Sequence, residues 1–334
     1  MSKKAWALLL ICVGIVAVLL GATASAQELQ KVRLSEVVRS VFYAPQYVAI
    51  SQGFFEEQGL SVDLSTAWGA DKGAAALISG SVDVGFFGPE ATVYIYSQGA
   101  EDHLVGFAQL TARDGSFFLT RDVDEEFAWE NVRGKTIVGA RVGGVPQMAL
   151  EWVLKKHGIE PFVDVEVITS LAFEAAVGAF EAGMGDYIAQ FEPALSEIEA
   201  RNRGKIVASI GAEAGPMSYT VYHARKSVLE ENPDLFVRFT RAIHQGQLWV
   251  SSHSAEEVAE VIAPFFPLID LEILAKSMGL YQSIDAWPPT PIISEEHFSH
   301  LQEIMIEAGE LAEMVPFSVL MQNTIAKSVV EELE

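Results

Sequence analysis

The sequence has little cysteine, little basic charge and only one long apolar run. Its 334 residues include one cysteine, Cys12, and 22 Lys and Arg against 45 Asp and Glu, a net charge of −23. Because the chain beyond residue 26 has no cysteine, it folds without disulfides. The acidic surplus disfavours nucleic acid and anionic lipid as partners, since like charges repel. No internal repeat and no low-complexity tract is visible.

The apolar run lies at the N-terminus and predicts a secretory signal peptide over residues 1–26. A short basic start precedes the uncharged run at residues 5–20, and residues 24–26 give the small-x-small cleavage pattern. An uncleaved membrane anchor is the alternative, although the run is slightly short for a span. Cys12 lies inside the run, so no lipid-bearing N-terminal cysteine is expected. We expect a secreted, periplasmic or cell-surface protein with a net charge of about −25 after cleavage near Ala26.

Alternating apolar and helical segments predict an α/β fold. Strand-like runs recur along the chain, and most are followed by a helical stretch or by glycine and proline. This order is typical of layers with mainly parallel strands. The predicted strands are 32–38, 60–67, 82–87, 104–111, 116–120, 135–142, 163–169, 186–191, 205–210 and 218–222. Beyond residue 222 the chain is predicted to be helical to its end.

The predicted strands fall into two groups, so we expect two α/β lobes. Lobe 1 is discontinuous and takes residues 27–118 and 217–334, and lobe 2 takes residues 119–216. The acidic, loop-like stretch at 122–131 separates the two groups. Two crossover strands that join such lobes would let them rotate and close around a ligand.

The residues after the first strand place two aromatic side chains where ligands gather in α/β proteins. Phe42 and Tyr43 follow the strand at 32–38, Pro45 can open a helix, and Gly53 can close it in a left-handed conformation. Ligands of open α/β sheets bind at strand ends, where helix N-termini present free N–H groups. The alternative is that Phe42 and Tyr43 are core residues of a strand–helix corner.

Three stretches resemble a known family. The pattern Phe-Tyr-Ala-Pro-Gln-Tyr-Val-Ala-Ile-x-x-Gly-Phe-Phe-Glu-Glu-x-Gly-Leu at residues 42–60, with residues 77–85 and 134–139, is similar to substrate-binding proteins of ABC importers. The branch that it resembles handles nitrate, sulfonates, taurine and thiamine-pyrimidine precursors, and the similarity spans residues 30–330. It implies the type II periplasmic-binding-protein fold. The implied activity is capture of a small solute and its delivery to a membrane permease, without catalysis or a cofactor.

The resemblance implies that the ligand-binding residues lie in loops at strand ends of both lobes. Residue types in these loops vary with the ligand in such proteins, so the prediction concerns positions. The residues at these positions are Phe42, Tyr43, Gln46, Trp68, Gly88, Glu90 and Thr111 in lobe 1, and Arg141, Gly143, Gly144, Gln147, Gln190, Phe191 and Glu192 in lobe 2.

Two sets among these residues would suit ligands of opposite charge. Gly143 and Gly144 before a helix could cradle an anion with the help of Arg141, but we favour the alternative, a plain turn that needs unusual backbone angles. Glu90 and Glu192 each follow a strand beside a proline, and a carboxylate in a closed cleft needs a partner with N–H donors or positive charge. The alternative is that each glutamate caps the helix that follows it, which we favour for Glu90.

The aromatic residues at the strand ends favour a flat, nitrogen-bearing ring over a bare anion. Stacking against a ring or a cation is what such side chains do well. We therefore expect an aromatic nitrogen heterocycle such as a thiamine-pyrimidine precursor. The alternatives are a sulfonate, taurine or nitrate anion and a guanidinium-like cation. The expected partners are a small molecule and a membrane permease, and the expected state is a monomer.

Functions of other classes fit the sequence less well. A pyrimidine-synthase-like enzyme would share this fold, but such relatives are intracellular and rely on histidine-rich chemistry. His297 and His300 are three residues apart on a predicted helix, and no convergent ligands accompany them as a metal pair would need. A sensory or structural receptor without a permease is the third alternative.

Overall fold

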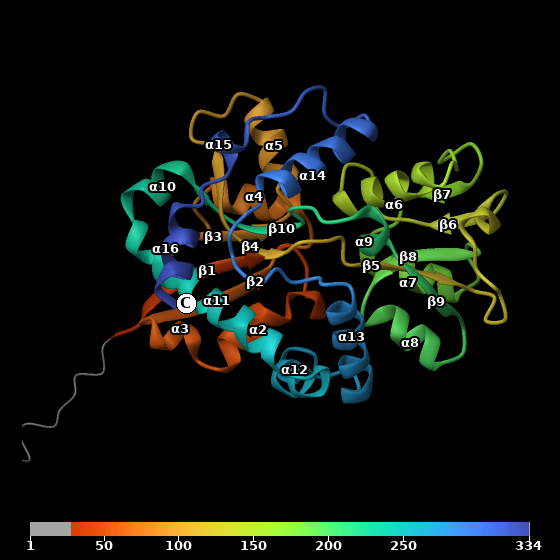
Figure 1. The fold of residues 1–334 in the computed structure, drawn as a ribbon, viewed down its shortest axis with the longest axis horizontal. Coiled ribbons are helices and arrows are strands. Elements are labelled where there is room, and N and C mark those ends of the chain that lie inside the picture. The colour runs from red at the N-terminus through yellow and green to blue at the C-terminus, as the bar shows by residue number, and fades with distance from the viewer. Residues whose placement is uncertain (1–27, 334) are drawn as a thin grey trace, which may run out of the picture.

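The computed structural model describes residues 28–333, with the side chain of Glu174 excepted. Two five-stranded sheets lie side by side, each covered by helices on its faces (Figure 1). Within residues 28–333 no helix is long and apolar enough to cross a bilayer. The predicted signal peptide falls in residues 1–27, outside the described part of the chain.

The first sheet has the strand order β2-β1-β3-β10-β4. β1 pairs in parallel with β2 and β3, whereas β10 is antiparallel to both of its neighbours. All residues of β3 and β4 are buried, which fits their continuous apolar sequence. The strands are β1 (Gln30–Glu36), β2 (Leu60–Thr66), β3 (Val84–Phe87), β4 (Leu104–Thr111) and β10 (Thr220–Arg225).

The second sheet repeats this plan with the order β7-β6-β8-β5-β9. β6 is parallel to β7 and β8, and β5 is antiparallel to β8 and β9. Its strands are β5 (Ser116–Thr120), β6 (Thr136–Val138), β7 (Glu166–Ile168), β8 (Tyr187–Phe191) and β9 (Lys205–Ser209). The predicted α/β class is confirmed, with one antiparallel strand in each sheet.

The chain passes from the first sheet to the second at residues 112–115. β5 pairs with β8 and β9 from Ser116 to Thr120, so the predicted lobe boundary at 118/119 falls inside a strand of the second sheet. The chain returns at residues 210–219, between β9 and β10. The division into two closing lobes stays a prediction.

Helices follow most strands and pack on both faces of the sheets (Figure 1). The C-terminal third is helical after β10, as predicted. The α-helices are α2 (Ala44–Ser51), α3 (Phe54–Glu57), α4 (Ala70–Ile78), α5 (Glu90–Ser97), α6 (Val145–Lys156), α7 (Phe173–Glu181), α8 (Ala194–Ala200), α9 (Ile210–Ala214), α10 (Lys226–Glu231), α11 (Pro233–Ser252), α12 (Ala255–Ile262), α13 (Leu271–Ser283), α14 (Glu295–Glu307), α15 (Phe317–Leu320) and α16 (Thr324–Leu333). Short 3-10 helices span Val41–Tyr43, Trp129–Val132 and Ala263–Phe265.

Local sequence explains the limits of α2. Pro45 stands in its first turn, where no backbone donor is needed. Gly53 follows the helix with φ of 77°, a left-handed conformation that glycine adopts without a Cβ clash. Both features agree with the predicted start and end of this helix.

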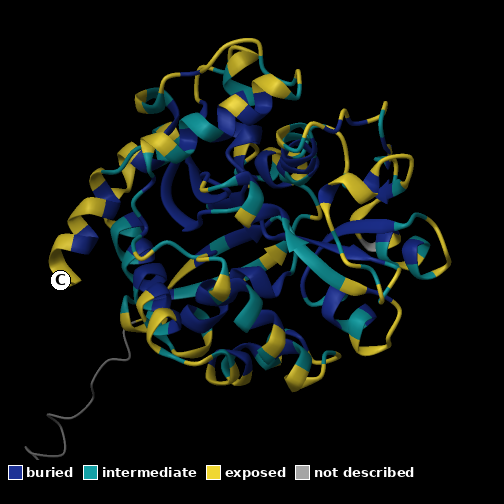
Figure 2. Cartoon of the chain, turned by 45° about the vertical axis from the view of Figure 1, so that its right-hand side comes forward, coloured by how far each residue is buried: buried dark blue, intermediate teal, exposed yellow. Residues whose placement is uncertain are grey.

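An aromatic cluster packs where the two sheets meet. The Phe42 ring is fully buried and its centroid lies 4.7 Å from that of Tyr281 and 6.0 Å from that of Phe191. The Tyr281 hydroxyl donates to the Gly115 carbonyl oxygen at 3.1 Å and accepts from the Glu192 N–H at 3.2 Å. Buried residues therefore continue from one sheet into the other, while exposed residues lie on the outer helix faces (Figure 2).

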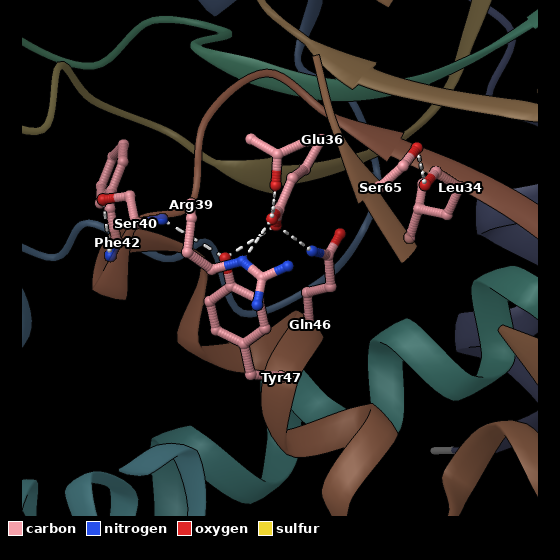
Figure 3. Close-up of polar contacts among 9 residues, drawn as sticks. Leu34, Glu36, Arg39, Ser40, Phe42, Gln46, Tyr47 and Ser65 are labelled. Carbon is pink, nitrogen blue, oxygen red and sulfur yellow. Dashed lines mark hydrogen bonds and ion pairs between the residues drawn. The ribbon is translucent and has the colours of Figure 1, made fainter. Parts of the chain in front are cut away.

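The loop after β1 is held by a buried carboxylate, that of Glu36 (Figure 3). Its oxygens accept from Arg39 Nε at 2.5 Å, from the Tyr47 hydroxyl at 2.7 Å and from Gln46 Nε2 at 3.0 Å. Thr66 Oγ1 of β2 donates to it at 2.9 Å. Burial raises the pKa of Glu36, and Arg39 opposes that effect. One side chain thus ties two strands, the loop and α2 together.

Replacing Glu36 by alanine is expected to lower the free energy of unfolding by about 3–5 kcal/mol, because Arg39 and three neutral donors lose their acceptor. Urea denaturation at neutral pH measures the change. Asp63→Ala is the matched control, since Asp63 on β2 forms an exposed ion pair with Lys31. The control should change stability by less than about 0.5 kcal/mol. A Glu36→Ala protein as stable as the control would contradict the anchoring role.

Candidate functional site

A cavity of about 300 Å³ lies between the two sheets. Its walls come from the loops that follow β1, β2 and β3, from the loops that follow β6 and β7, and from the ends of β5, β8 and β10. This volume suits a small ligand of the size of a single ring with substituents. The cavity therefore occupies the strand-end position that the sequence predicts for a binding site.

Eight of the predicted binding residues line this cavity, and both sheets contribute. Tyr43 and Phe191 offer aromatic surface, and Trp68 is half exposed at 49% with φ of 60°. The eight residues are Tyr43, Trp68, Gly88, Glu90, Arg141, Gly144, Gln190 and Phe191. Their part in binding stays a prediction.

Three predicted residues of the first sheet lie outside the lining because other groups enclose them. Phe42 belongs to the aromatic cluster between the sheets, so of the pair only Tyr43 reaches the cavity. Gln46 is used by the Glu36 network and by the Tyr222 hydroxyl, which donates to its side-chain oxygen at 3.0 Å. Thr111 exchanges a short hydrogen bond with Thr220.

Three predicted residues of the second sheet also lie outside the lining. Gly143, with φ of 80°, accepts the Tyr94 hydroxyl at its carbonyl oxygen at 3.2 Å, so it belongs to a turn. Gln147 accepts from the Ala140 N–H at 3.0 Å and donates to Glu151 at 2.8 Å. Glu192 caps α8, where its carboxylate accepts from the Ser196 N–H at 3.1 Å. The Ser277 hydroxyl donates to the same carboxylate at 3.2 Å.

The sequence prediction missed several lining residues at the points where the chain changes sheets. Ser116 is the first residue of β5, and Tyr219 and Thr220 lie where the chain returns to β10. The position of the predicted crossovers could have identified them. Other lining residues that the prediction omitted are Val37, Val38, Gly69, Ala70, Lys72, Gly139, Ala140, Leu171, Ala172, Phe173, Ala176 and Ala189.

Glu90 is the one ionisable side chain in the lining that is both buried and lacks a partner at one oxygen. Its side chain is 6% exposed, and Oε2 makes no hydrogen bond. Burial raises the pKa of Glu90 to about 7, although the N–H groups of Glu90 and Ala91 at the start of α5 oppose that effect. A Cβ on Gly88 would lie 2.0 Å from Oε2, so a larger residue at this position would displace the Glu90 carboxylate. Glu90 therefore contributes a buried, incompletely hydrogen-bonded carboxylate to the cavity lining.

The cationic side chains of the lining lie at the edge of the cavity. Arg141 Nη2 lies 3.8 Å from Asp71 Oδ1, and both side chains are more than half exposed. Lys72 stands on the exposed side of α4. At the start of α6 the Gly144 N–H donates to the Arg141 carbonyl oxygen, and Pro146 has no N–H. This turn therefore offers an anion few of the donors that a cradle needs.

Two further groups of aromatic and histidine residues lie outside the cavity lining. Phe86 and Phe87 both lie in the core, where Phe86 stacks on Tyr222 and Phe87 on His223, so neither faces the cavity. His300 contacts the Ala214 carbonyl oxygen at 2.9 Å. Within residues 28–333 no group of three or more His, Cys, Asp and Glu could hold a metal ion.

A comparison with known protein families identifies the family of this chain. A family model described as NMT1/THI5 like matches residues 41–257. The chain belongs to this family. The sequence is 41% identical over 323 residues to the binding protein YtlA of Bacillus subtilis, covering 96% of this chain and 97% of the relative. The predicted family resemblance is therefore confirmed, and this relative is named as a binding protein, as the sequence analysis expects.

Solved structures share the fold at low sequence identity. The alkanesulfonate-binding protein SsuA from Xanthomonas axonopodis pv. citri has a TM-score of 0.71 at 15% identity, with 89% of this chain and 99% of that chain covered. The periplasmic nitrate-binding protein NrtA from Synechocystis PCC 6803 has a TM-score of 0.73 at 15% identity, with 93% and 90% covered. These similarities confirm the periplasmic-binding-protein fold.

The raised pKa of Glu90 makes stability depend on pH. The folded protein holds the Glu90 proton up to pH of about 7, against 4.5 as the ordinary value, so stability falls as pH rises between these values. Glu90→Gln removes that loss and should raise the free energy of unfolding by about 3 kcal/mol at pH 8, but hardly at pH 4.

Urea denaturation at both pH values tests this effect in the ligand-free protein. Glu295→Gln is the control, because Glu295 also lies in the first turn of a helix but is exposed. It should leave the stability difference between the two pH values unchanged. A Glu90→Gln variant with no gain at pH 8 would show that the carboxylate is not destabilised by burial.

Proposed function

We propose that this protein captures a small, planar, nitrogen-bearing solute such as an aminopyrimidine outside the cytoplasmic membrane and delivers it to an ABC permease. The observation that carries the proposal is the Glu90 carboxylate, which is 6% exposed, lines the cavity and has one oxygen without a partner. An ionised carboxylate buried in this way is costly unless it meets an N–H donor or a positive charge. A ligand with such donors satisfies it.

The rest of the lining supports a flat ring. Aromatic side chains come from both sheets, and aliphatic ones from Val37 and Val38 complete the walls. Rings of this kind stack on a heterocycle or on a delocalised cation. The aromatic lining residues are Tyr43, Trp68, Phe173, Phe191 and Tyr219.

An anion is the second candidate, and helix direction favours it. The N-terminal residues of α4, α5, α6 and α7 line the cavity, and the positive ends of helix dipoles attract negative charge. The similar folds of SsuA and NrtA belong to an alkanesulfonate-binding and a nitrate-binding protein. Against this candidate, Glu90 already supplies an anion at the start of α5, and a second one beside it would be repelled.

Calorimetric titration with a panel of solutes tests the proposal. The panel holds aminopyrimidines, methylguanidinium, taurine, an alkanesulfonate and nitrate. We expect an aminopyrimidine to bind the most tightly, and Glu90→Gln to weaken it by about 10- to 100-fold, because a charge-assisted hydrogen bond is lost. Glu295→Gln, the exposed control, should bind as the unaltered protein does. Tight binding of a sulfonate that is unaffected by Glu90→Gln would overturn the proposal.

The pH dependence of affinity separates the two candidates, because methylguanidinium and nitrate keep their charge between about pH 5 and pH 8. A cation needs ionised Glu90, so its affinity should fall by about 20-fold from pH 7.5 to pH 5.5 as the carboxyl with a pKa of about 7 takes up a proton. The affinity for an anion should rise over the same range. For whichever of the two ions binds, Glu90→Gln should abolish the dependence.

A further inference from the structure

We infer that the cavity recognises a second N–H group of its ligand through a wall formed by Ser116 and Tyr219. Asp114 is the positioning residue, because it orients the side chains of this wall so that they accept a hydrogen bond. The inference deepens the proposed function and rests on it. It narrows the ligand to a planar molecule with two separate N–H groups, one for Glu90 and one for this wall. A diaminopyrimidine has that form.

Asp114 is fixed in the passage between the two sheets. It lies between β4 and β5, and its side chain is fully buried. Oδ1 accepts from the Ser116 N–H at 2.8 Å and, in a shorter hydrogen bond, from the Ser116 hydroxyl. Oδ2 makes no hydrogen bond. The segment at residues 210–219, where the chain returns to the first sheet, packs directly against Asp114. A Cβ on Gly211 would lie 1.9 Å from the Asp114 carbonyl oxygen.

The orientation of the Ser116 hydroxyl decides what the wall offers. A serine hydroxyl has one hydrogen to donate and two lone pairs that accept. Because Ser116 gives its hydrogen to Asp114, only lone pairs remain for a group in the cavity that Ser116 lines. The wall therefore accepts N–H donors and offers no hydrogen to a ligand acceptor.

Tyr219 extends this wall. Its hydroxyl lies close enough to the Asp114 carboxylate for the two groups to change each other's pKa, and Tyr219 lines the cavity as Ser116 does. Burial raises the pKa of Asp114 to about 6, so the carboxyl is mostly ionised at neutral pH and continues to accept from Ser116. Glu90 lines the same cavity as Ser116 and Tyr219, so the two recognition points belong to one cavity.

A ligand pair that differs by one amino group tests the inference. Calorimetry should show 2,4-diaminopyrimidine binding to the unaltered protein at least about 10-fold more tightly than 4-aminopyrimidine. In Ser116→Ala the acceptor is gone, and in Asp114→Ala its orientation is lost. In both variants we expect the advantage of the diamine to fall below about 3-fold. Because each variant meets both ligands, differences in ligand basicity cancel from the comparison.

Ser218→Ala is the matched control. Ser218 is a fully buried serine in the returning segment, residues 210–219, and does not line the cavity. It should keep the full advantage of the diamine. A purely structural role for Asp114 would weaken both ligands alike and leave their ratio unchanged, which overturns the inference. If Asp114→Ala does not fold, Ser116→Ala decides alone.

The outcomes also separate this inference from the proposed function. If both pyrimidines bind and both need Glu90, while Ser116→Ala keeps the ratio, the second recognition point is wrong and the proposed function stands. If neither pyrimidine binds and a sulfonate does, the proposed function is wrong and the inference falls with it.

Discussion

The hydrogen bonds to the buried Glu36 carboxylate hold in place the cavity wall that the loop after β1 contributes. Four side chains from the loop after β1, from α2 and from β2 donate to it. A buried charge costs several kcal/mol unless it is paired and its lone pairs are satisfied, so these partners cannot drift apart cheaply. The loop that they hold carries Val37, Val38 and Tyr43 into the cavity wall. Rigid support of this kind keeps binding groups in place before a ligand arrives.

The cavity combines two electrostatic tendencies that oppose each other. Four helices begin around it, and their positive ends would suit an anion. Glu90 lies at one of these ends and carries the negative charge itself. Under the proposed function, this carboxylate gives a cavity surrounded by helix N-termini a preference for N–H donors.

Local patterns in the sequence predict the order of strands and helices and the limits of α2, because apolar periodicity, Pro45 and Gly53 act within a few residues. Side-chain partners far along the chain could not be predicted. Glu192 caps α8 and also meets Ser277, 85 residues away, and Phe42 is enclosed by Tyr281. The lobe boundary at 118/119 hid Ser116, since the chain had already changed sheets. The role of Glu36 could have been suspected from the sequence, because this carboxylate lies on the apolar face of the first predicted strand.

The two buried carboxyls that lie in and beside the cavity make the folded protein less stable at neutral pH than neutral side chains would. Burial raises the pKa of Glu90 to about 7 and that of Asp114 to about 6, and each keeps one oxygen without a partner. Asp114 is partly satisfied by Ser116, whereas the nearest donors to Glu90 are N–H groups of its own helix. A donor placed against Glu90 would supply the partner that its second oxygen lacks. Under the proposed function, an acceptor at the same place would be repelled, so the carboxylate that favours one class of ligand would also disfavour the other.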